Sequence, residues 1–432
     1  MSSRQRATLD EVCSLIADCP HSTPVWTESG YLVIRNQNIK NGKLDLSERS
    51  YTDHEHYLIR IRRAKPQYGD LILTREAPMG EVCMVPQGLE CCVGQRQVLL
   101  RPNPEKVVPR FLLYAIQSPE VQHEISWSEG TGSTVSNIRI PVLKNIRIPL
   151  LPLKQQDAIA SLLGALDDRI ALLRETNATL EAIAQALFKS WFVDFDPVHA
   201  RARGEQPEGL PEPLAALFPD SFEESPLGLV PRGWRVGELG EILALRNERT
   251  QPSDETKALP YVPIESIGAK TPFLAEFKPG EDANSSLILF KEGDILFGAM
   301  RPYFHKVCIA PFDGVTRTTV FTLSARNAEA RGFALFLTYQ DVTVEYATQH
   351  SEGSTIPYAK WKNSLERMPV LIPPDAVQEV FSEVVNSFVG RANANIQQAQ
   401  TLASLRDTLL PRLISGQLRL PETKEQLEES LA

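Results

Sequence analysis

The sequence predicts a mixed α+β protein built from two tandem α/β domains, each followed by one long helix. Two observations predict this fold class. The second half of the chain repeats short motifs of the first half in the same order. Each half then ends in a helical stretch whose apolar residues recur about every 3.5 positions, as in a coiled-coil seam. We therefore expect an internal pseudo-two-fold repeat and two paired helices.

Length and composition set the frame for this expectation. The 432 residues favour two to four domains, and 42% hydrophobic with 23% charged residues is ordinary globular composition. No apolar run of about 18 residues occurs, and the start of the chain lacks the apolar core of a signal peptide. We therefore expect a cytoplasmic protein without membrane contact. The six cysteines form no C-x-x-C pair, which argues against a zinc site or a disulfide framework.

The net charge of −9 is unevenly distributed along the chain. Residues 1–150 hold 18 basic and 16 acidic residues, whereas residues 151–232 hold 7 basic and 13 acidic residues. The excess acid therefore lies mostly in the helical and linker stretches. The α/β segments can still present a local basic face, although such a balance is also normal for any globular domain.

The repeat is visible in motifs whose offset drifts only from 230 to 220 residues. Residues 69–72 (GDLI) recur as residues 293–296 (GDIL), each before a short apolar strand and an arginine. The GTGST loop at 130–134 is echoed by GST at 353–355. Short β-branched or apolar runs bounded by Gly, Pro, Asn or Asp, such as YLVI, QVLL and VFTL, predict strands in both halves.

The helical stretches carry the second signal. The first keeps its period over more than four heptads and is stopped by Pro197, and the second keeps the period with weaker occupants. An amphipathic helix packed on its own domain is the alternative, but it suits a 3.6-residue period better. The expected seam residues are Ile159, Leu166, Leu173, Asn177, Leu180, Leu187, Phe388, Asn395, Leu402 and Leu409.

The stretch between the first helix and the second repeat is rich in Pro, Gly and charged residues, which is typical of a connector. The resulting division of the chain is 1–152 for the first α/β domain, 153–196 for the central helix, 197–231 for the linker, 232–373 for the second α/β domain, 374–416 for the distal helix and 417–432 for the C-terminal tail.

One stretch of the chain resembles a known family. Residues 185–200 (QALFKSWFVDFDPVHA) are very similar to the central conserved region of the specificity subunits of type I restriction-modification systems. The GD-[LI]-[IL] element, the Gly-Ser-Thr loop and the proline-bounded entry to each helix resemble the family's pattern in both halves. The resemblance implies that each α/β domain is a target recognition domain that reads one part of a split double-stranded DNA site.

The same resemblance implies further partners. The two helices are expected to pair as an antiparallel coiled coil that acts as a spacer and docks two methyltransferase (modification) subunits, and restriction/translocase subunits complete the complex. The second copy departs from the first at residues 298–306 (GAMRPYFHK, against TREAPMGEV at 74–82) and has Arg406 in its seam. These departures put in doubt any transfer of DNA-contacting roles between the halves.

Motifs of catalysis are missing from the sequence. It has no N/D-P-P-Y/F loop, no G-x-x-x-x-G-K-[ST] loop, no H-x-x-x-H pair and no G-x-S-x-G elbow. The DETK string at 254–257 is more typical of a solvated loop than of a nuclease. We therefore expect a non-catalytic subunit with no metal site and no cofactor of its own. The resemblance places S-adenosylmethionine, ATP and Mg on the partner subunits.

Duplex binding needs cations for phosphates and hydrogen-bonding groups for base edges. The candidates of the first half are Arg35, Lys40, Lys43, Arg60, Arg62, Arg63, Lys65, Arg75, Ser133 and Thr134. Those of the second half are Arg301, His305, Lys306, Arg317, Ser354, Thr355, Lys360 and Lys362. Each can instead belong to a solvated edge strand or a turn, and the interleaved Tyr303 and Trp361 are more typical of a core.

A second class of function stays open beside DNA recognition. The chain could be a coiled-coil scaffold that organises protein partners without sequence-specific DNA reading, and a stand-alone nuclease is a distant third. Sequence-specific binding to a bipartite site would separate the first two.

Overall fold

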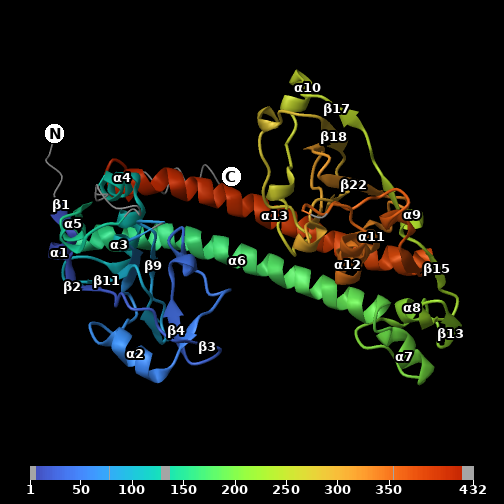
Figure 1. Ribbon diagram of the computed structural model, residues 1–432, viewed down its shortest axis with the longest axis horizontal. Coiled ribbons are helices and arrows are strands. Elements are labelled where there is room, and N and C mark those ends of the chain that lie inside the picture. The colour runs from blue at the N-terminus through green and yellow to red at the C-terminus, as the bar shows by residue number, and fades with distance from the viewer. Residues whose placement is uncertain (1–5, 77, 128–136, 354, 421–432) are drawn as a thin grey trace. The chain divides into compact units, whose positions relative to one another are not determined.

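The protein is described here by a computed structural model covering residues 6–76, 78–127, 137–353 and 355–420. The chain forms two compact units (Figure 1): unit 1 contains residues 1–170 and 400–432, and unit 2 contains residues 171–399. Three expected DNA contacts, Ser133, Thr134 and Ser354, lie outside the described residues.

Unit 1 is built on a four-stranded antiparallel sheet in the order β2-β11-β8-β9. Its strands are β2 (Cys13–Asp18), β8 (Leu71–Thr74), β9 (Val82–Met84) and β11 (Gln97–Pro102). All four residues of β8 are buried, as its unbroken apolar sequence requires. Helix α3 (Pro109–Gln117), which begins with proline at its first turn, packs against β9.

A second sheet of unit 1 has the order β10-β4-β7-β3, in which only β10 and β4 are parallel. Its strands are β3 (Trp26–Thr27), β4 (Tyr31–Ile34), β7 (Tyr51–Thr52) and β10 (Cys91–Val93). The other elements are β1 (Arg6–Thr8), α1 (Leu9–Val12), the hairpin β5 (Ile39–Lys40) and β6 (Lys43–Leu44), α2 (His54–Ile61), α4 (Pro119–Trp127), α5 (Ile140–Lys144) and β12 (Arg147–Pro149). Strand β1 pairs with β12, which leads into the first long helix.

Unit 2 repeats the first framework. Its four-stranded antiparallel sheet has the order β16-β22-β19-β20, so β16, β22, β19 and β20 correspond to β2, β11, β8 and β9. The pair of β15 and β23 corresponds to β1 and β12. The strands are β15 (Arg235–Glu238), β16 (Leu243–Leu245), β17 (Arg249–Thr250), β18 (Leu287–Phe290), β19 (Ile295–Gly298), β20 (Val307–Ile309), β21 (Gly314–Thr316), β22 (Val320–Ala325) and β23 (Pro369–Ile372). The predicted repeat is therefore confirmed as a repeated topology.

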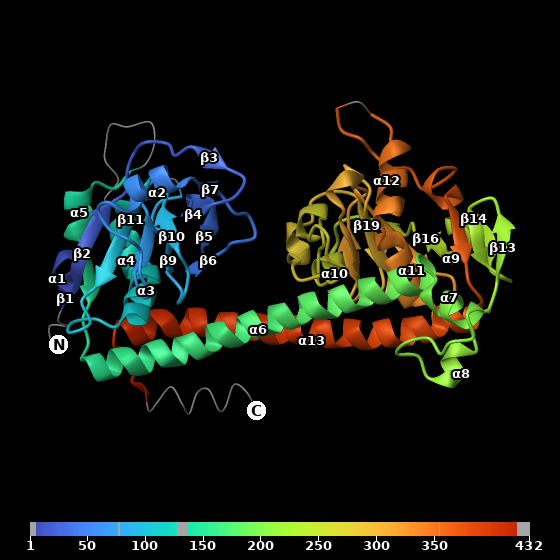
Figure 2. The same ribbon diagram turned by 90° about the horizontal axis from the view of Figure 1, so that it is seen from below.

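The helices of unit 2 cover its sheet. Helix α11 (Arg331–Tyr339) contacts β20 and is followed at once by α12 (Asp341–Gln349), as Figure 2 shows. The short helices α9 (Leu239–Ile242) and α10 (Asp254–Lys257) complete the unit. Phe333 and Phe336 of α11 are fully buried in an aromatic core, which explains why this helix is apolar on nearly every side.

The two long helices are α6 (Leu153–Phe192) and α13 (Asp375–Ile414), each of 40 residues. Within unit 2, the rings of Phe188 and Phe381 lie 5.7 Å apart and Asn177 is bonded to Asn395. Residue numbers thus rise along one helix as they fall along the other, so the helices are antiparallel. Among the described residues, no helix has the length and apolarity needed to cross a membrane.

The seam positions differ in burial. Six of the expected residues are buried: Ile159, Leu166, Leu173, Asn395, Leu402 and Leu409. The other four are half-buried: Asn177, Leu180, Leu187 and Phe388. In the last turns of α6, Phe188 is buried in place of Leu187, because unit 2 packs its aromatic core onto that side of the helix. Tertiary packing here competes with the heptad period.

The connector has its own structure. It contains α7 (Asp196–Ala202), α8 (Glu212–Ala215) and a hairpin of β13 (Phe222–Ser225) and β14 (Gly228–Pro231). Phe218 anchors it by packing edge-on against Trp191 at 5.2 Å and beside Trp234 at 6.4 Å. Composition predicted a connector but not this aromatic anchor, because the rings that hold it lie outside the Pro-rich stretch.

The repeated Gly-Asp motif has a physical explanation. Gly69 and Gly293 adopt φ values of 85° and 83°, a region that glycine occupies without strain. Asp70 is buried, accepts a hydrogen bond from the backbone of Gln67 at 2.9 Å and pairs through both oxygens with Arg101 at 2.9 and 2.8 Å. Asp294 has equivalent partners in unit 2: it accepts a hydrogen bond from the backbone of Lys291 at 2.9 Å and pairs with Arg246 at 2.6 and 3.3 Å.

Candidate nucleic-acid interface

Three segments of unit 1 meet at the turn between β8 and β9. Asn36 donates a hydrogen bond to the carbonyl of Glu76 at 3.5 Å, and the backbone of Asn41 donates to Glu81 at 2.8 Å. The backbone of Ile138 donates to the carbonyl of Arg75 at 3.0 Å. We call the segments 35–44, 75–81 (without residue 77, which lies outside the described residues) and 137–138 the first loop cluster.

Unit 2 brings three segments together at the corresponding turn, between β19 and β20. The backbone of Lys270 donates to the carbonyl of His305 at 2.8 Å, and the backbone of Arg301 donates to the carbonyl of Pro357 at 2.8 Å. We call the segments 264–272, 299–306 and 357–360 the second loop cluster. The same turn of the repeated framework thus gathers surface loops in each unit, and binding residues are commonly carried on such loops.

Several predicted cations of unit 1 are exposed. Arg35, Lys40 and Arg62 form no ion pair with any residue that the structure describes. Arg63 is exposed but donates to the carbonyls of Asp18 and Cys19 at 3.1 and 3.4 Å. Lys65 is paired with Glu90 at 2.8 Å, and Lys43 lies 3.9 Å from Asp167.

Two predicted cations of unit 1 are buried. Arg60 is 4% exposed and donates to the carbonyls of Val93, at 3.0 Å, and Ser22. Burial also lowers the pKa of this guanidinium. Arg75 donates to Asp18 at 2.5 Å and to the carbonyl of Ile138 at 3.0 Å. Both side chains hold loops in place, so we leave them out of the proposed interface.

The candidate residues of unit 2 likewise divide into buried residues that hold the fold and residues at the surface. His305 is buried and lies 3.1 Å from Asp341, and burial lowers the pKa of its ring. Lys306 donates to the carbonyls of Ile264 and Ile267, at 2.8 Å each. Arg301 is half-buried, and both Arg301 and His305 have a φ of 51°. These three residues shape the turn, and non-glycine residues in this conformation store strain.

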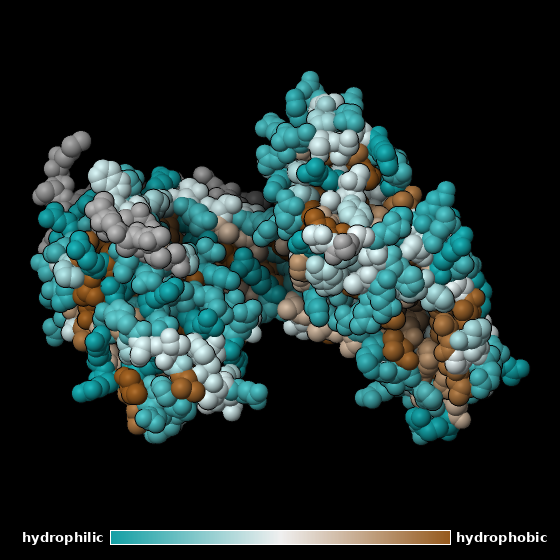
Figure 3. All heavy atoms as spheres, viewed as in Figure 1, coloured by the Kyte–Doolittle hydropathy of each residue, from teal (hydrophilic) through white to brown (hydrophobic). Residues whose placement is uncertain are grey.

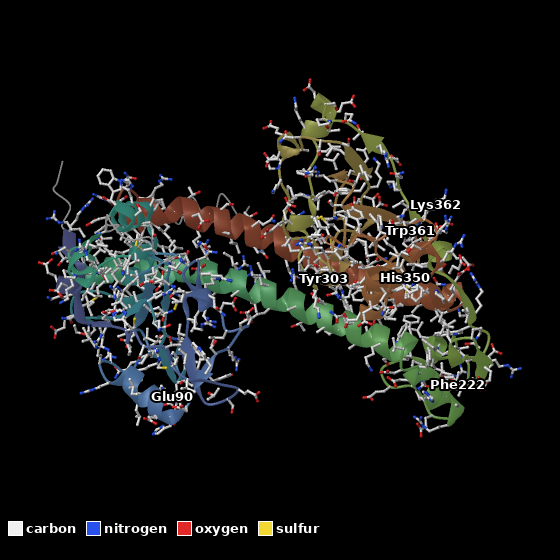
Figure 4. All side chains as sticks on the ribbon, viewed as in Figure 1. Glu90, Phe222, Tyr303, His350, Trp361 and Lys362 are labelled. Atoms are coloured by element: carbon white, nitrogen blue, oxygen red, sulfur yellow. The ribbon has the colours of Figure 1, made fainter. Side chains whose placement is uncertain are left out.

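The remaining candidates of unit 2 lie at the surface. Arg317, Thr355 and Lys362 are exposed, and Lys360 is paired with Glu352. Figure 4 labels Lys362 next to Trp361, which is buried as its residue type suggested. Tyr303 was expected in the core, but it is 49% exposed and lies against the ring of Phe304 at 4.8 Å.

Sequence reasoning missed an aromatic residue of unit 1. Trp26 is 45% exposed and lies under the guanidinium of Arg35, with 5.1 Å from Cζ to the ring centroid. A single tryptophan in a short polar stretch carries no signal of exposure. On the face shown in Figure 3, both units are mainly hydrophilic, and the exposed apolar residues form small patches. Trp26 is one of several exposed aromatic residues, and Arg35 is the cation that lies over its ring.

Metal and thiol chemistry find little support in the described residues. No group of three or more His, Cys, Asp or Glu side chains that could hold a metal is found there. Burial raises the pKa of the thiols of Cys13, Cys83, Cys91 and Cys92 to about 12, which keeps them protonated at neutral pH.

A duplicated α/β framework with corresponding loop clusters, together with two long antiparallel helices, defines a protein with two tandem repeats of one domain. The family described as "Type I restriction modification DNA specificity domain" matches residues 5–182 and again residues 231–402. The chain belongs to this family. The family that the sequence resembles is therefore confirmed over the two repeats, and residues 185–200 lie between the two matched ranges.

Relatives and a solved structure agree with this membership. The MjaIX specificity subunit of Methanocaldococcus jannaschii is 27% identical over 370 residues, covering 82% of this chain and 78% of the relative. The HindI specificity subunit of Haemophilus influenzae is 25% identical over 409 residues, covering 81% and 86%. The crystal structure of a type I restriction-modification S subunit from M. genitalium is 18% identical, covers 96% of this chain and 97% of its own, and has a TM-score of 0.59. That structure shares the fold.

Proposed function

We propose that this chain is the DNA-recognition subunit of a type I restriction-modification complex and binds a split double-stranded site. One loop cluster contacts each half-site. The observation that carries this proposal is the placement of exposed cations, including Arg35 and Lys40, on loops gathered at the same turn of a repeated framework. Such cations neutralise phosphates, and side chains on the same loops can reach base edges.

The catalytic partners are the second part of the proposal. Two methyltransferase subunits dock on the long helices, and restriction/translocase subunits join the complex. Leu172 and Ile183 support docking, because these large apolar residues of α6 are exposed although the helix already has a partner. S-adenosylmethionine, ATP and Mg bind to those partners, so calorimetry should detect no binding of either cofactor by the isolated chain.

The test is an exchange of residues 1–150 for the matching segment of a relative that recognises another sequence. Tyr114 and Arg110 are kept, because they bond to Asp167 and Asp168 of α6, each at 2.6 Å. Methylated sites are then mapped across the genome of cells that contain the partner subunits. We expect one half of the recognised sequence to change and the other half to stay.

The reciprocal exchange of residues 233–372 is the matched control and should change only the other half-site. If both half-sites changed together, the model of two independent recognition domains would be wrong. If methylation did not depend on this chain in a sequence-specific way, the scaffold function would be favoured instead.

A further inference from the structure

Arg35 differs from three arginines of unit 1 that ion pairs hold in the framework. Arg75, Arg101 and Arg110 each pair with an aspartate at 2.5, 2.8 and 2.6 Å. Arg35 is exposed, pairs with no carboxylate in the described chain, and makes one side-chain hydrogen bond, to Ser50 Oγ at 3.3 Å. Its other N–H groups are therefore directed to solvent at the start of the first loop cluster.

Trp26 holds this guanidinium in place. The ring belongs to β3, the outermost strand of the second sheet, and the Arg35 Cζ atom lies 5.1 Å from its centroid. Arg35 follows β4 directly, so both partners are attached to strands rather than to a long loop. A guanidinium stacked on an aromatic face has its plane restricted while its edge stays accessible.

The chemistry of that edge matches a base with two neighbouring acceptors. A guanidinium presents two parallel N–H donors, and guanine offers the matching acceptors, O6 and N7, in the major groove. Arginine can bind a phosphate in the same paired manner, but a phosphate contact carries no preference for one base over another. Restricting the side chain before binding reduces the entropy lost in a directional contact.

We propose that Arg35 reads one guanine in the half-site contacted by unit 1, and that Trp26 is its positioning residue. The proposal rests on the proposed function. The guanidinium donates one hydrogen bond to O6 and one to N7, and the indole ring keeps the donor plane in the orientation that this contact requires.

The experiment is selection of binding sites from a randomised DNA pool by the purified full-length protein. Wild-type protein should select guanine at one position of the half-site that the exchange of residues 1–150 alters. Arg35→Lys keeps the charge but loses the paired donors, so preference for guanine at that position should fall roughly 5- to 150-fold. Trp26→Leu should lower it in the same direction, whereas Trp26→Phe should largely retain it.

Arg49→Lys is the matched control, because Arg49 is exposed and has, among the described residues, neither an ion pair nor an aromatic ring beneath it. This variant should leave preference at every position unchanged. Thermal unfolding of each variant checks that the Trp26 substitutions leave unit 1 folded. If Trp26→Leu unfolds the unit, the Arg35→Lys result decides alone.

Modified DNA gives a second measurement. Replacing the selected guanine by 7-deazaguanine removes N7, which should weaken binding of the wild type but leave the Arg35→Lys variant unaffected. The proposal is overturned if Arg35→Lys keeps full preference for guanine, because a lysine retains the charge and can replace arginine in a phosphate contact but not in the paired contact with guanine. If the wild type selects no sequence at all, the proposed function fails instead.

Discussion

Asn395 donates a hydrogen bond from its Nδ2 to Asn177 Oδ1 at 2.8 Å, and Asn177 donates in turn to the carbonyl of Ala392 at 3.1 Å. Asn395 is 2% exposed. A buried asparagine pair in a coiled coil specifies one register, because any shift separates the amides. The pair therefore fixes how α6 and α13 align within unit 2.

Replacing Asn395 alone by leucine should lower the free energy of unfolding by about 1–3 kcal/mol, because the amide of Asn177 then lacks its partner. Replacing both by leucine should recover that loss but allow other registers. Urea unfolding measures the first effect, and disulfide trapping between cysteines introduced at facing positions measures the second. An exposed control, Thr179→Leu, should change neither. If the double variant kept the stability and the register of the wild type, the Asn177–Asn395 pair would not be what fixes the register of the two helices.

Arg406 occupies a seam position that looked like a defect in the sequence. In unit 1 it donates to Asp167 at 2.6 Å, and the hydroxyl of Tyr114 donates to the other oxygen of Asp167 at 2.6 Å. Arg406→Leu leaves this mostly buried carboxylate with only the more distant Lys43, at 3.9 Å, as a cation, so unfolding should become easier by about 1–3 kcal/mol. Arg406→Leu combined with Asp167→Leu should restore most of the loss. Equal stability of wild type and single variant in urea would contradict a structural role for the pair.

Glu181 gives unit 2 a pH dependence. Burial raises the pKa of its carboxyl, although Tyr339 donates a hydrogen bond to it at 2.9 Å. The folded state therefore binds a proton at Glu181 more strongly than the unfolded state does. Protonation of Glu181 thus stabilises the folded state, and this stabilisation is lost as the pH rises through the raised pKa. Glu181→Gln keeps an acceptor for Tyr339 and removes the charge.

The stability advantage of Glu181→Gln over the wild type should be a fraction of a kcal/mol at neutral pH and vanish near pH 4, about the usual value for glutamate. Thermal unfolding at a series of pH values measures it. Glu238→Gln, at a surface carboxylate, should show no such trend. An advantage that grew on acidification would reverse the assigned sign.

Arg62 is the simplest test of phosphate contact. It is exposed and has no ion pair with the residues that the structure describes, so Arg62→Ala should reduce the slope of log K against log salt by about 0.9. Lys65→Ala is the control, because Lys65 is already paired with Glu90. Arg63 is a poorer choice, since its contacts with two carbonyls make it part of the fold. An unchanged slope for Arg62→Ala would show that Arg62 contacts no phosphate and is only a solvated surface residue.

Patterns along the chain predicted the framework well, because period and repetition are local properties. Each copy of the Gly-Asp motif and each heptad stretch is formed by residues close together in the sequence, and the structure shows both features as repeated elements. Burial of single cations was beyond the sequence. Arg60 shares a helical face with Tyr57, three residues earlier on α2, and both are buried. The basic stretch gave no sign of a helix, so its one inward arginine could not be told from its exposed neighbours.

The site was harder still, because its geometry joins distant residues. Trp26 in β3 and Arg35 directly after β4 are nine positions apart in the sequence, and the strand order β4-β7-β3 brings them together. The loops that meet at the β8–β9 turn come from segments separated by up to about 100 residues. No pairwise spacing in the sequence encodes such a meeting point.

In both sheets an ion pair ties the edge strand to the strand two positions away. Asp18, the last residue of β2, pairs with Arg75, which directly follows β8, so this pair reaches across β11. Asp294 precedes β19 and pairs with Arg246, which directly follows the edge strand β16, so this pair reaches across β22. Each edge strand can leave its sheet only when its ion pair breaks. Amide hydrogens of β2 and β16 should therefore exchange with solvent together with those of β8 and β19, and neither edge strand should fray independently.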